Sequence, residues 1–194
     1  MATPTSVGPL LVKKEYQLNG PRLIICKGSI PDWPKLQNER PEVLRPLAVV
    51  NAANQRLCGG GGVDGMIHTK AGPELGKQLL RQPLLRPGIR CPTGEAVETK
   101  GYNFNVDFII HTCGPNYGSG EPSRCKDDLT NAYRSSLTKA QQLGVKCVAF
   151  PAISTGLQAY PIKEATQVAL SVLKDAKAPL EELWVVLFTQ GRAR

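Results

Sequence analysis

A run of glycines closely follows two asparagines that end an apolar segment. Val49 to Asn54 reads Val-Val-Asn-Ala-Ala-Asn, and Gly59 to Gly65 reads Gly-Gly-Gly-Gly-Val-Asp-Gly. Consecutive glycines let backbone N–H groups approach a ligand with no Cβ atom in the way. A glycine loop that leaves a strand and opens a helix presents these groups to an anion, so the stretch predicts a phosphate site with Asp64 at its rim. A flexible glycine linker is the alternative, but linkers need no strand before them and no helix after them.

A second loop of similar character lies further along the chain. Val145 to Phe150 has the pattern of a buried strand, Pro151 to Pro161 is a loop of mainly small and polar residues, and Ile162 to Asp175 has a helical pattern. Two such loops at the ends of neighbouring strands can face each other and hold a diphosphate. Taken alone, Ser154-Thr155-Gly156 also fits an ordinary turn with a capping hydroxyl.

Strands and helices alternate along the chain, which predicts an α/β protein with a mostly parallel sheet covered on both faces. We expect one domain over residues 10–190 and a disordered N-terminus over residues 1–9. The expected strands are Leu11–Leu18, Arg22–Lys27, Leu47–Asn51, Glu95–Thr99, Val106–His111, Val145–Phe150 and Glu182–Phe188. The expected helices are Val63–Lys70, Pro73–Arg81, Arg124–Leu143 and Ile162–Asp175.

The segment from Pro31 to Pro46 differs from the rest, because it combines four prolines with mixed charges and Trp33. This composition predicts an extended surface loop. Substrate recognition is one interpretation of such a loop. A harmless insertion is favoured, because surface loops tolerate added length at little cost in free energy.

Composition limits the class of protein. With 194 residues, 41% of them hydrophobic, the chain suits a single domain with a substantial core. We expect neither a signal peptide nor a membrane span. The six cysteines include no Cys-x-x-Cys pair, which favours reduced thiols in the cytoplasm or nucleus. The net charge of +8 is spread along the chain, so RNA or another polyanion is only a weakly supported partner, and we expect a monomer.

The chain has two histidines, and neither is placed as a nucleophile's partner or a metal ligand. His68 stands one helical turn after Asp64, where it could support the site, although packing or capping is the favoured interpretation. His111 ends an apolar strand, and we expect it to form hydrogen bonds within the core.

The two loops, their order, Pro92-Thr93-Gly94-Glu95-Ala96 and the segment Ile109 to Pro115 resemble a macrodomain from about Leu23 to Phe188. The glycine loop is most similar to that of the MacroD-type ADP-ribosyl hydrolases. The resemblance implies a three-layer α/β/α sandwich with a mixed, mostly parallel central sheet. It also implies binding of ADP-ribose and of mono-ADP-ribosylated proteins, with neither a cofactor nor a metal.

The resemblance gives roles to particular residues. Asn54 matches the asparagine that binds the distal ribose, and Asp64 matches the aspartate that orients or deprotonates the attacking water, a role that a substrate phosphate can share. As simpler alternatives, Asn54 would cap its own turn and Asp64 would favour the helix N-terminus. The other candidate ligand-binding residues are Ser29, Ile30, Ala53, Gly60, Gly61, Gly62, Val63, Ser154, Thr155, Gly156, Leu157, Gln158, Ala159 and Phe188.

Two departures from the family pattern concern the ends of the ligand. Ser29 stands where the family commonly has an aspartate that accepts from the adenine amino group, and Gln158-Ala159 stands where an aromatic residue and a glycine are usual. Phe188 fits the residue that lines the adenine pocket. These observations leave two hypotheses: an enzyme that removes mono-ADP-ribose from acidic side chains and cleaves O-acetyl-ADP-ribose, or a non-catalytic reader of ADP-ribose.

Overall fold

The computed structural model describes residues 11–188, so the expectation for residues 1–9 lies outside the described part. Its seven strands form one sheet in the order β1-β2-β7-β6-β3-β5-β4. The five inner strands are parallel, and β1 and β4 are antiparallel to their neighbours at the two edges. The strands are β1 (Leu11–Gln17), β2 (Arg22–Lys27), β3 (Leu47–Ala52), β4 (Ala96–Lys100), β5 (Phe108–Thr112), β6 (Cys147–Pro151) and β7 (Glu182–Leu187).

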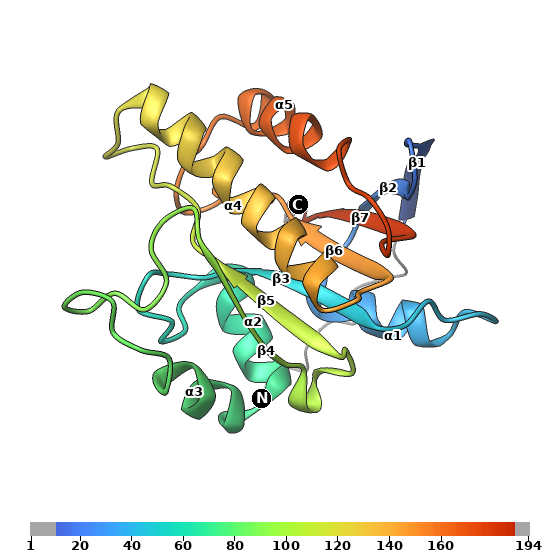
Figure 1. Cartoon of the computed structure of the whole chain (residues 1–194), viewed down its shortest axis with the longest axis horizontal. Coiled ribbons are helices and arrows are strands. Elements are labelled where there is room, and N and C mark those ends of the chain that lie inside the picture. The colour runs from blue at the N-terminus through green and yellow to red at the C-terminus, as the bar shows by residue number, and fades with distance from the viewer. Residues whose placement is uncertain (1–10, 189–194) are drawn as a thin grey trace, which may run out of the picture.

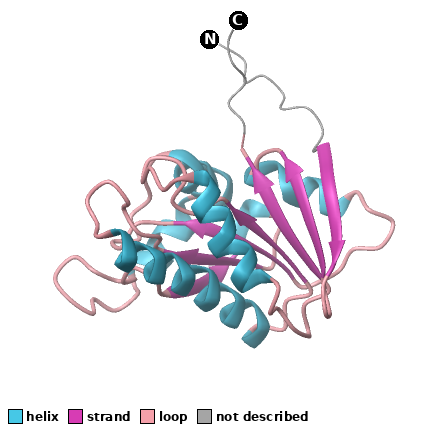
Figure 2. Ribbon diagram, turned by 90° about the horizontal axis from the view of Figure 1, so that it is seen from above, coloured by secondary structure: helices cyan, strands magenta, loops and turns pink. Residues whose placement is uncertain are grey.

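Helices cover both faces of the sheet, so the predicted three-layer sandwich is confirmed (Figures 1 and 2). One core lies under α4 and α5, and the other lies under α1, α2 and α3. Adjacent strand residues alternate between these cores, as Val49 and Val50 do in β3. The helices are α1 (Trp33–Asn38), α2 (Gly62–Ala71), α3 (Pro73–Leu80), α4 (Pro122–Gln142) and α5 (Ile162–Leu173), with short 3-10 turns η1 (Ile30–Asp32) and η2 (Tyr102–Phe104).

The chain leaves two neighbouring strands in opposite directions. After β3 it enters α2 on one face and continues toward β4 and β5, whereas after β6 it enters α5 on the other face and continues toward β7. In open α/β sheets, ligands bind outside the carboxyl ends of the strands at such a switch point. The topology therefore places the two predicted anion loops at the edge where a ligand is expected.

The prediction of a surface excursion over Pro31 to Pro46 is wrong for its first half. Residues 30–38 form η1 and α1, and Trp33 is fully buried and packs edge to face on Trp184 with ring centroids 6.2 Å apart. Pro34 lies in the first turn of α1, where a missing N–H removes no helical hydrogen bond. Residues 30–38 are therefore part of the core, whereas residues 39–46 form an exposed or half-buried connection to β3, as predicted.

The predicted strands and the four predicted helices lie within two residues of the observed bounds. All six cysteines are free thiols, five of them buried, and Cys58 alone is exposed. No helix in residues 11–188 combines the length and the apolarity needed to cross a membrane.

Candidate functional site

The glycine loop runs directly into the N-terminus of α2, as predicted. Gly59 and Gly62 adopt φ angles of 77° and 63°, and Gly61 is the N-cap residue with no side chain that caps the helix. Within residues 11–188, the N–H groups of Gly60, Gly61 and Gly62 donate to no backbone carbonyl. Unpaired N–H groups at the positive end of a helix dipole form a site for an anion.

The second loop also presents free backbone donors. Tyr160 N donates to Ser154 O and Ala159 N donates to Gly156 O, which folds residues 154–160 into a compact turn. Ser154 and Ala159 hold this turn at φ angles of 65° and 54°, so Ala159 adopts the left-handed conformation although it has a side chain. The N–H groups of residues 156–158 donate to no backbone carbonyl of the described chain.

The two loops meet beyond the carboxyl ends of the inner strands β3 and β6. A Cβ atom built on Gly61 would lie 3.5 Å from Leu157 Cδ1, and the Leu157 side chain is otherwise exposed. β3 and β6 are adjacent and parallel, so their carboxyl ends bring the loops together. This arrangement can hold two linked phosphates between two sets of N–H groups.

Asp64 lies beneath the glycine loop and not at its rim, so that part of the prediction is wrong. The residue is 4% exposed, because the first turn of α2 packs against the sheet. Its Oδ1 atom accepts a hydrogen bond of 2.7 Å from Asn51 Nδ2. Its Oδ2 atom lies 3.2 Å from the position of a Cβ atom on exposed Gly60 and receives no hydrogen bond from a described side chain, so this oxygen faces the loop.

Asn51 connects Asp64 to two further buried side chains. Its Nδ2 group also donates to His111 Nδ1 at 3.0 Å, so the proton of the neutral ring is on Nε2, which donates to Thr99 Oγ1 at 3.0 Å. Asn51 and His111 are paired in register on β3 and β5, and both are fully buried. The prediction that His111 forms hydrogen bonds within the core is confirmed.

The pKa shifts of Asp64 and His111 favour Asp64 as a proton acceptor. Burial raises the pKa of the Asp64 carboxyl, while the Asn51 hydrogen bond and the nearby His68 oppose the rise. Burial, and then the proximity of His68, lowers the pKa of His111 to about 3, so this ring is neutral at pH 7. A carboxylate with a raised pKa accepts a proton from water more readily than an ordinary one does.

His68 lies beside the carboxylate from the next turn of α2. Its Nε2 atom is 3.5 Å from Asp64 Oδ1, and its ring lies under Gly59, whose missing Cβ atom would be 3.4 Å from His68 Nδ1. The favoured interpretation of His68 as a packed residue agrees with this position. The same position lets the ring support both the glycine loop and Asp64.

Asn54 uses much of its amide to shape the turn before the glycines. Its Nδ2 group donates to Gly59 O at 2.8 Å, and its Oδ1 atom accepts from the Arg56 N–H at 3.0 Å. The turn-forming role that sequence offers as the simpler alternative is therefore present. One N–H of the half-buried amide remains free, and it lies close to Gly60, so a role toward a ligand is compatible with this geometry.

The other candidates occupy the same edge of the sheet. Ser29 and Ile30 follow β2 and are buried, whereas Phe188 follows β7 and is 58% exposed. Ala53 precedes Asn54, Val63 follows the glycine loop in α2, and both are half-buried. The Thr155 hydroxyl donates to Ala152 O. In strand order, β2, β7, β6 and β3 each contribute a segment to one continuous row.

Sequence reasoning missed the link from Asn51 through His111 to Thr99. The signal that was present is a polar residue at the buried end of two apolar strands, Val49–Asn51 and Ile109–His111. Such residues need hydrogen-bond partners inside the protein, and the partners here come from neighbouring strands.

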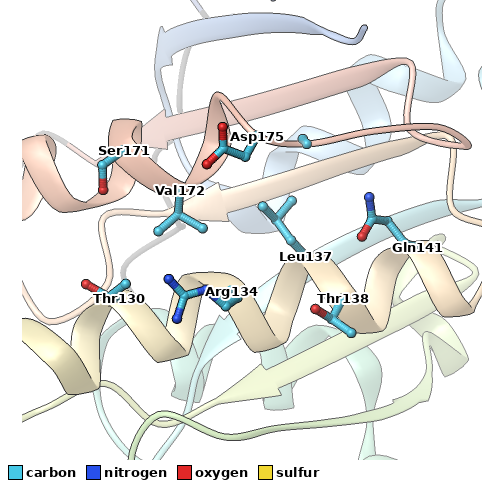
Figure 3. Close-up of a pocket in the computed structure, with 9 residues that line it drawn as sticks. Thr130, Arg134, Leu137, Thr138, Gln141, Ser171, Val172 and Asp175 are labelled. Atoms are coloured by element: carbon cyan, nitrogen blue, oxygen red, sulfur yellow. The ribbon is translucent and has the colours of Figure 1, made fainter. Parts of the chain in front are cut away.

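A hollow of about 170 Å³ lies elsewhere, between α4 and α5 (Figure 3). Thr130, Arg134 and Leu137 form one wall, and Ser171, Val172 and Asp175 form the other. These helices cover the face of the sheet opposite to α2, so the hollow is separate from Asp64. It includes none of the predicted site residues.

Comparison with known proteins agrees with this geometry. The family model described as "Macro domain" matches residues 50–169. A macro domain-containing protein of Xanthomonas axonopodis is 44% identical over 127 residues, which cover 66% of this chain and 70% of that protein. A macro domain-containing protein of Methanosarcina mazei is 46% identical over 132 residues, covering 68% and 67%.

Solved structures give the same result. The Oceanobacillus iheyensis macrodomain with ADP superposes with a TM-score of 0.77 at 36% identity, over 91% of this chain and 88% of that one. The Trypanosoma brucei macrodomain in complex with ADP-ribose superposes with a TM-score of 0.69 at 32% identity, over 86% and 64%.

Proposed function

This chain belongs to the macro domain family, and we propose that it binds ADP-ribose and hydrolyses the ester that joins mono-ADP-ribose to an acidic side chain. O-acetyl-ADP-ribose, which carries a similar ester, is the second proposed substrate. Binding is supported by the ligands named for two similar structures, ADP and ADP-ribose. It is also supported by the two facing loops, whose free N–H groups suit a diphosphate.

The extent of the row of loops fits a ligand of this length. From β2 to β3 the row spans three strand spacings, or about 14 Å. We assign the adenine to the end near Ser29, Ile30 and Phe188, and the diphosphate to the two central loops. The distal ribose then lies near Asn54, above Asp64.

The observation that carries the catalytic part of the proposal is the buried Asp64 carboxylate, with one oxygen fixed by Asn51 and the other facing Gly60. A water held by Oδ2 would lie beside the distal ribose. Asp64 orients this water and accepts its proton as the ester bond breaks, with the substrate phosphate as a second proton acceptor in the same loops. The water oxygen bonds to C1″ of the distal ribose as the bond from C1″ to the ester oxygen breaks, so the ribose gains a hydroxyl from the water and the acidic side chain leaves as a carboxylate.

A reader of ADP-ribose that binds without turnover is the second candidate. Gln158 cannot stack on the distal ribose as an aromatic ring would, which weakens the orientation of the reacting end. Ser29 offers adenine a neutral acceptor in place of a charged one. Both departures affect the geometry needed for hydrolysis more than the grip of the loops on the diphosphate.

Two measurements on the purified protein test the proposal. ADP-ribose is expected to raise the melting temperature much more than ribose 5-phosphate does, because only ADP-ribose reaches both loops. Loss of label from a peptide carrying ADP-ribose on glutamate is then followed with time, beside the release of acetate from O-acetyl-ADP-ribose. Binding with no loss of label identifies a reader, and equal stabilisation by the two ligands contradicts the two-loop site.

A further inference from the structure

The first part of the segment between α3 and β4 is basic. No acidic residue occurs between Glu74 and Glu95, and this interval contains Lys77, Arg81, Arg86 and Arg90. Lys77 is paired with Glu74 at 2.6 Å on α3 itself. The three arginines lie in residues 81–90, which we name the arginine loop.

The arginine loop is open to solvent and keeps its charge unpaired. Arg81 and Arg86 are exposed, and Leu84 and Leu85 between them are 57% and 59% exposed. Among residues 11–188, no carboxylate forms an ion pair with Arg81, Arg86 or Arg90. Two exposed leucines flanked by free arginines make a surface that is both apolar and positive, which suits an acidic partner.

The arginine loop is fastened to the turn that carries Asn54. Gln55 O accepts hydrogen bonds from Arg90 N at 2.8 Å and Cys91 N at 3.0 Å, and Arg90 Nη1 donates to Arg56 O at 3.4 Å. Arg56 is exposed and adds a further positive charge at this junction. The C-terminal end of the arginine loop, at Arg90, therefore lies against the turn that carries Asn54, and the rest of the loop runs between this point and the end of α3. Figure 1 shows α3 on the same side of the sheet as α2.

The direction of the proposed ligand brings its protein end to this surface. With adenine at β2 and β7, the distal ribose lies at β3, and whatever is attached to that ribose continues toward β5 and β4. The arginine loop follows α3 and leads into β4, on that side of the row. It is thus placed next to the part of a substrate that is not ADP-ribose.

We propose that the arginine loop, together with Arg56, binds acidic residues that flank the modified side chain of a protein substrate. This inference rests on the proposed function and adds the substrate class, namely a peptide with several carboxylates near the ADP-ribosylated residue. Charge complementarity at an exposed surface increases the association rate and selects among partners. Residues 81–90 contain no aromatic side chain for base stacking, so an acidic peptide fits this surface better than a single-stranded nucleic acid does.

The test compares two peptides that carry the same ADP-ribosylated glutamate, one flanked by acidic residues and one by serines. We expect the wild type to bind the acidic peptide roughly fivefold more tightly at low ionic strength, with the difference reduced by salt. Arg81→Glu/Arg86→Glu is expected to abolish or invert this preference and to leave the affinity for free ADP-ribose within twofold. Lys174→Glu/Lys177→Glu is the matched control, because each pair contains a helix C-cap residue and changes the net charge equally.

The outcomes separate this inference from the proposed function. Tight binding of ADP-ribose with equal affinity for both peptides overturns the role of the arginine loop and leaves the macrodomain site intact. No binding of ADP-ribose or of either peptide overturns the proposed function itself. A loss of preference in the control pair as large as in the arginine pair would assign the effect to overall charge. A single-stranded oligoribonucleotide that loses affinity only in the arginine variant, with unchanged peptide preference, would replace the acidic peptide by RNA.

Discussion

Asp64 of α2 is held by Asn51 at the end of β3, and the proposed role of its carboxylate depends on that contact. Asn51 fixes one carboxylate oxygen from β3, while the fold of α2 directs the other oxygen to the glycine loop. A group fixed in this way loses little further freedom when a water is activated. One oxygen is thus fixed by Asn51 and the other is free for a water, which leads to the first prediction.

Asp64→Ala is expected to lower the rate of ester hydrolysis by about 10² or more and to leave ADP-ribose affinity within severalfold. In the proposed mechanism the carboxylate acts mainly in the transition state, whereas backbone N–H groups hold the diphosphate. Asn54→Ala should reduce both quantities, because the amide also braces the turn before Gly59. Single-turnover kinetics and calorimetry on both variants check this, with exposed Asp127→Ala as the control. Undiminished turnover in Asp64→Ala would remove Asp64 from the mechanism.

His111 is expected to position Asp64 from a distance, through Asn51. Replacement by leucine removes the acceptor for Asn51 Nδ2 and the donor to Thr99, so kcat should fall by roughly tenfold while ADP-ribose affinity stays within twofold. His111→Gln keeps a side-chain acceptor and should recover part of the loss. A pH–rate profile tests the cause, because a displaced Asp64 shifts the acidic limb of the profile. Unchanged kcat in the leucine variant would show that Asn51 holds Asp64 unaided.

At the scale of residues, the sequence predicts the groups that could contact a ligand. It does not predict the buried side chains that hold those groups in place. Asn54, Asp64 and the glycines stand in one short stretch, so their proximity is local. The contact of Asn51 with His111 depends on the pairing of β3 with β5, which are 60 residues apart at that point. Register between distant strands is a property of the whole sheet, and no local pattern encodes it.

At the scale of elements, α2 and the glycine loop are fitted to each other at Gly65. A Cβ atom on Gly65 would lie 2.4 Å from Gly60 O, whereas one on Gly76 of α3 would meet nothing within 4 Å. Alanine in place of a helical glycine ordinarily stabilises a protein by about 1 kcal/mol. The first site should reverse that sign, because the loop must move away from the helix.

We therefore expect Gly76→Ala to raise the free energy of unfolding by roughly 0.5–1 kcal/mol and Gly65→Ala to lower it by about 1 kcal/mol or more. The Gly65 variant should also bind ADP-ribose more weakly, since its glycine loop is displaced. Urea denaturation and calorimetry on the pair provide the measurement. An increase in stability in both variants would mean that the loop yields freely and does not form a rigid anion site.

The second loop contains its own strained position. Ala159 adopts a φ angle of 54°, and a left-handed conformation costs an L-residue about 1 kcal/mol. Ala159→Gly is thus expected to raise the free energy of unfolding by roughly 0.5 kcal/mol. Ala152→Gly in the same connection has no positive φ to relieve and should lower it by a similar amount. Thermal unfolding of both variants measures these changes in stability. Equal changes in the two variants would exclude backbone strain at Ala159 as the cause.

The strands and the long helices could be predicted because their apolar patterns are local. The helix α1 could not, since Pro31 and Pro34 suggest a loop and only tertiary packing shows that Trp33 enters the core. Proline is compatible with the first turn of a helix, because the missing N–H has no partner there. The prediction was wrong because it treated these prolines as helix breakers wherever they stood. The same packing makes residues 30–38 part of the core, while residues 39–46 remain a surface connection.

At the scale of the whole molecule, one buried carboxylate near the C-terminus of the chain forms ion pairs with two arginines near its N-terminus. Glu182 at the start of β7 is 1% exposed and accepts hydrogen bonds from Arg40, Arg22 and Trp184 Nε1. Burial alone would raise the pKa of Glu182, but these donors, Arg40 first, lower it to about 2. The ion pair therefore stabilises the fold fully only above the ordinary pKa of a glutamate.

This gives a prediction for acid stability. As the pH falls from about 4.5 to about 2, the unfolded chain takes up a proton that folded Glu182 resists, so roughly 3 kcal/mol of stability is lost in that window. Glu182→Gln should cost about 3 kcal/mol at pH 7 and progressively less toward pH 2. Urea titrations from pH 7 to pH 3 measure the difference in free energy of unfolding between the wild type and the variant. The control, Glu39→Gln at an exposed position, is expected to change the free energy of unfolding by less than about 0.5 kcal/mol. A difference that does not vary with pH would contradict the assignment.

Lys27 of β2 pairs with Leu11 of β1 on one side and with Leu187 of β7 on the other. The first and last strands therefore meet the edge of the ligand site about 10 Å apart, across a single strand. A linker of a few residues in place of residues 1–10 and 189–194 could join them and close the polypeptide into a ring, which could be reopened at the exposed turn of Pro87 and Gly88. Such a circular permutant would keep every strand pairing and carry its new ends within the arginine loop, between Arg86 and Arg90. A fluorophore attached there would report directly on an arriving substrate.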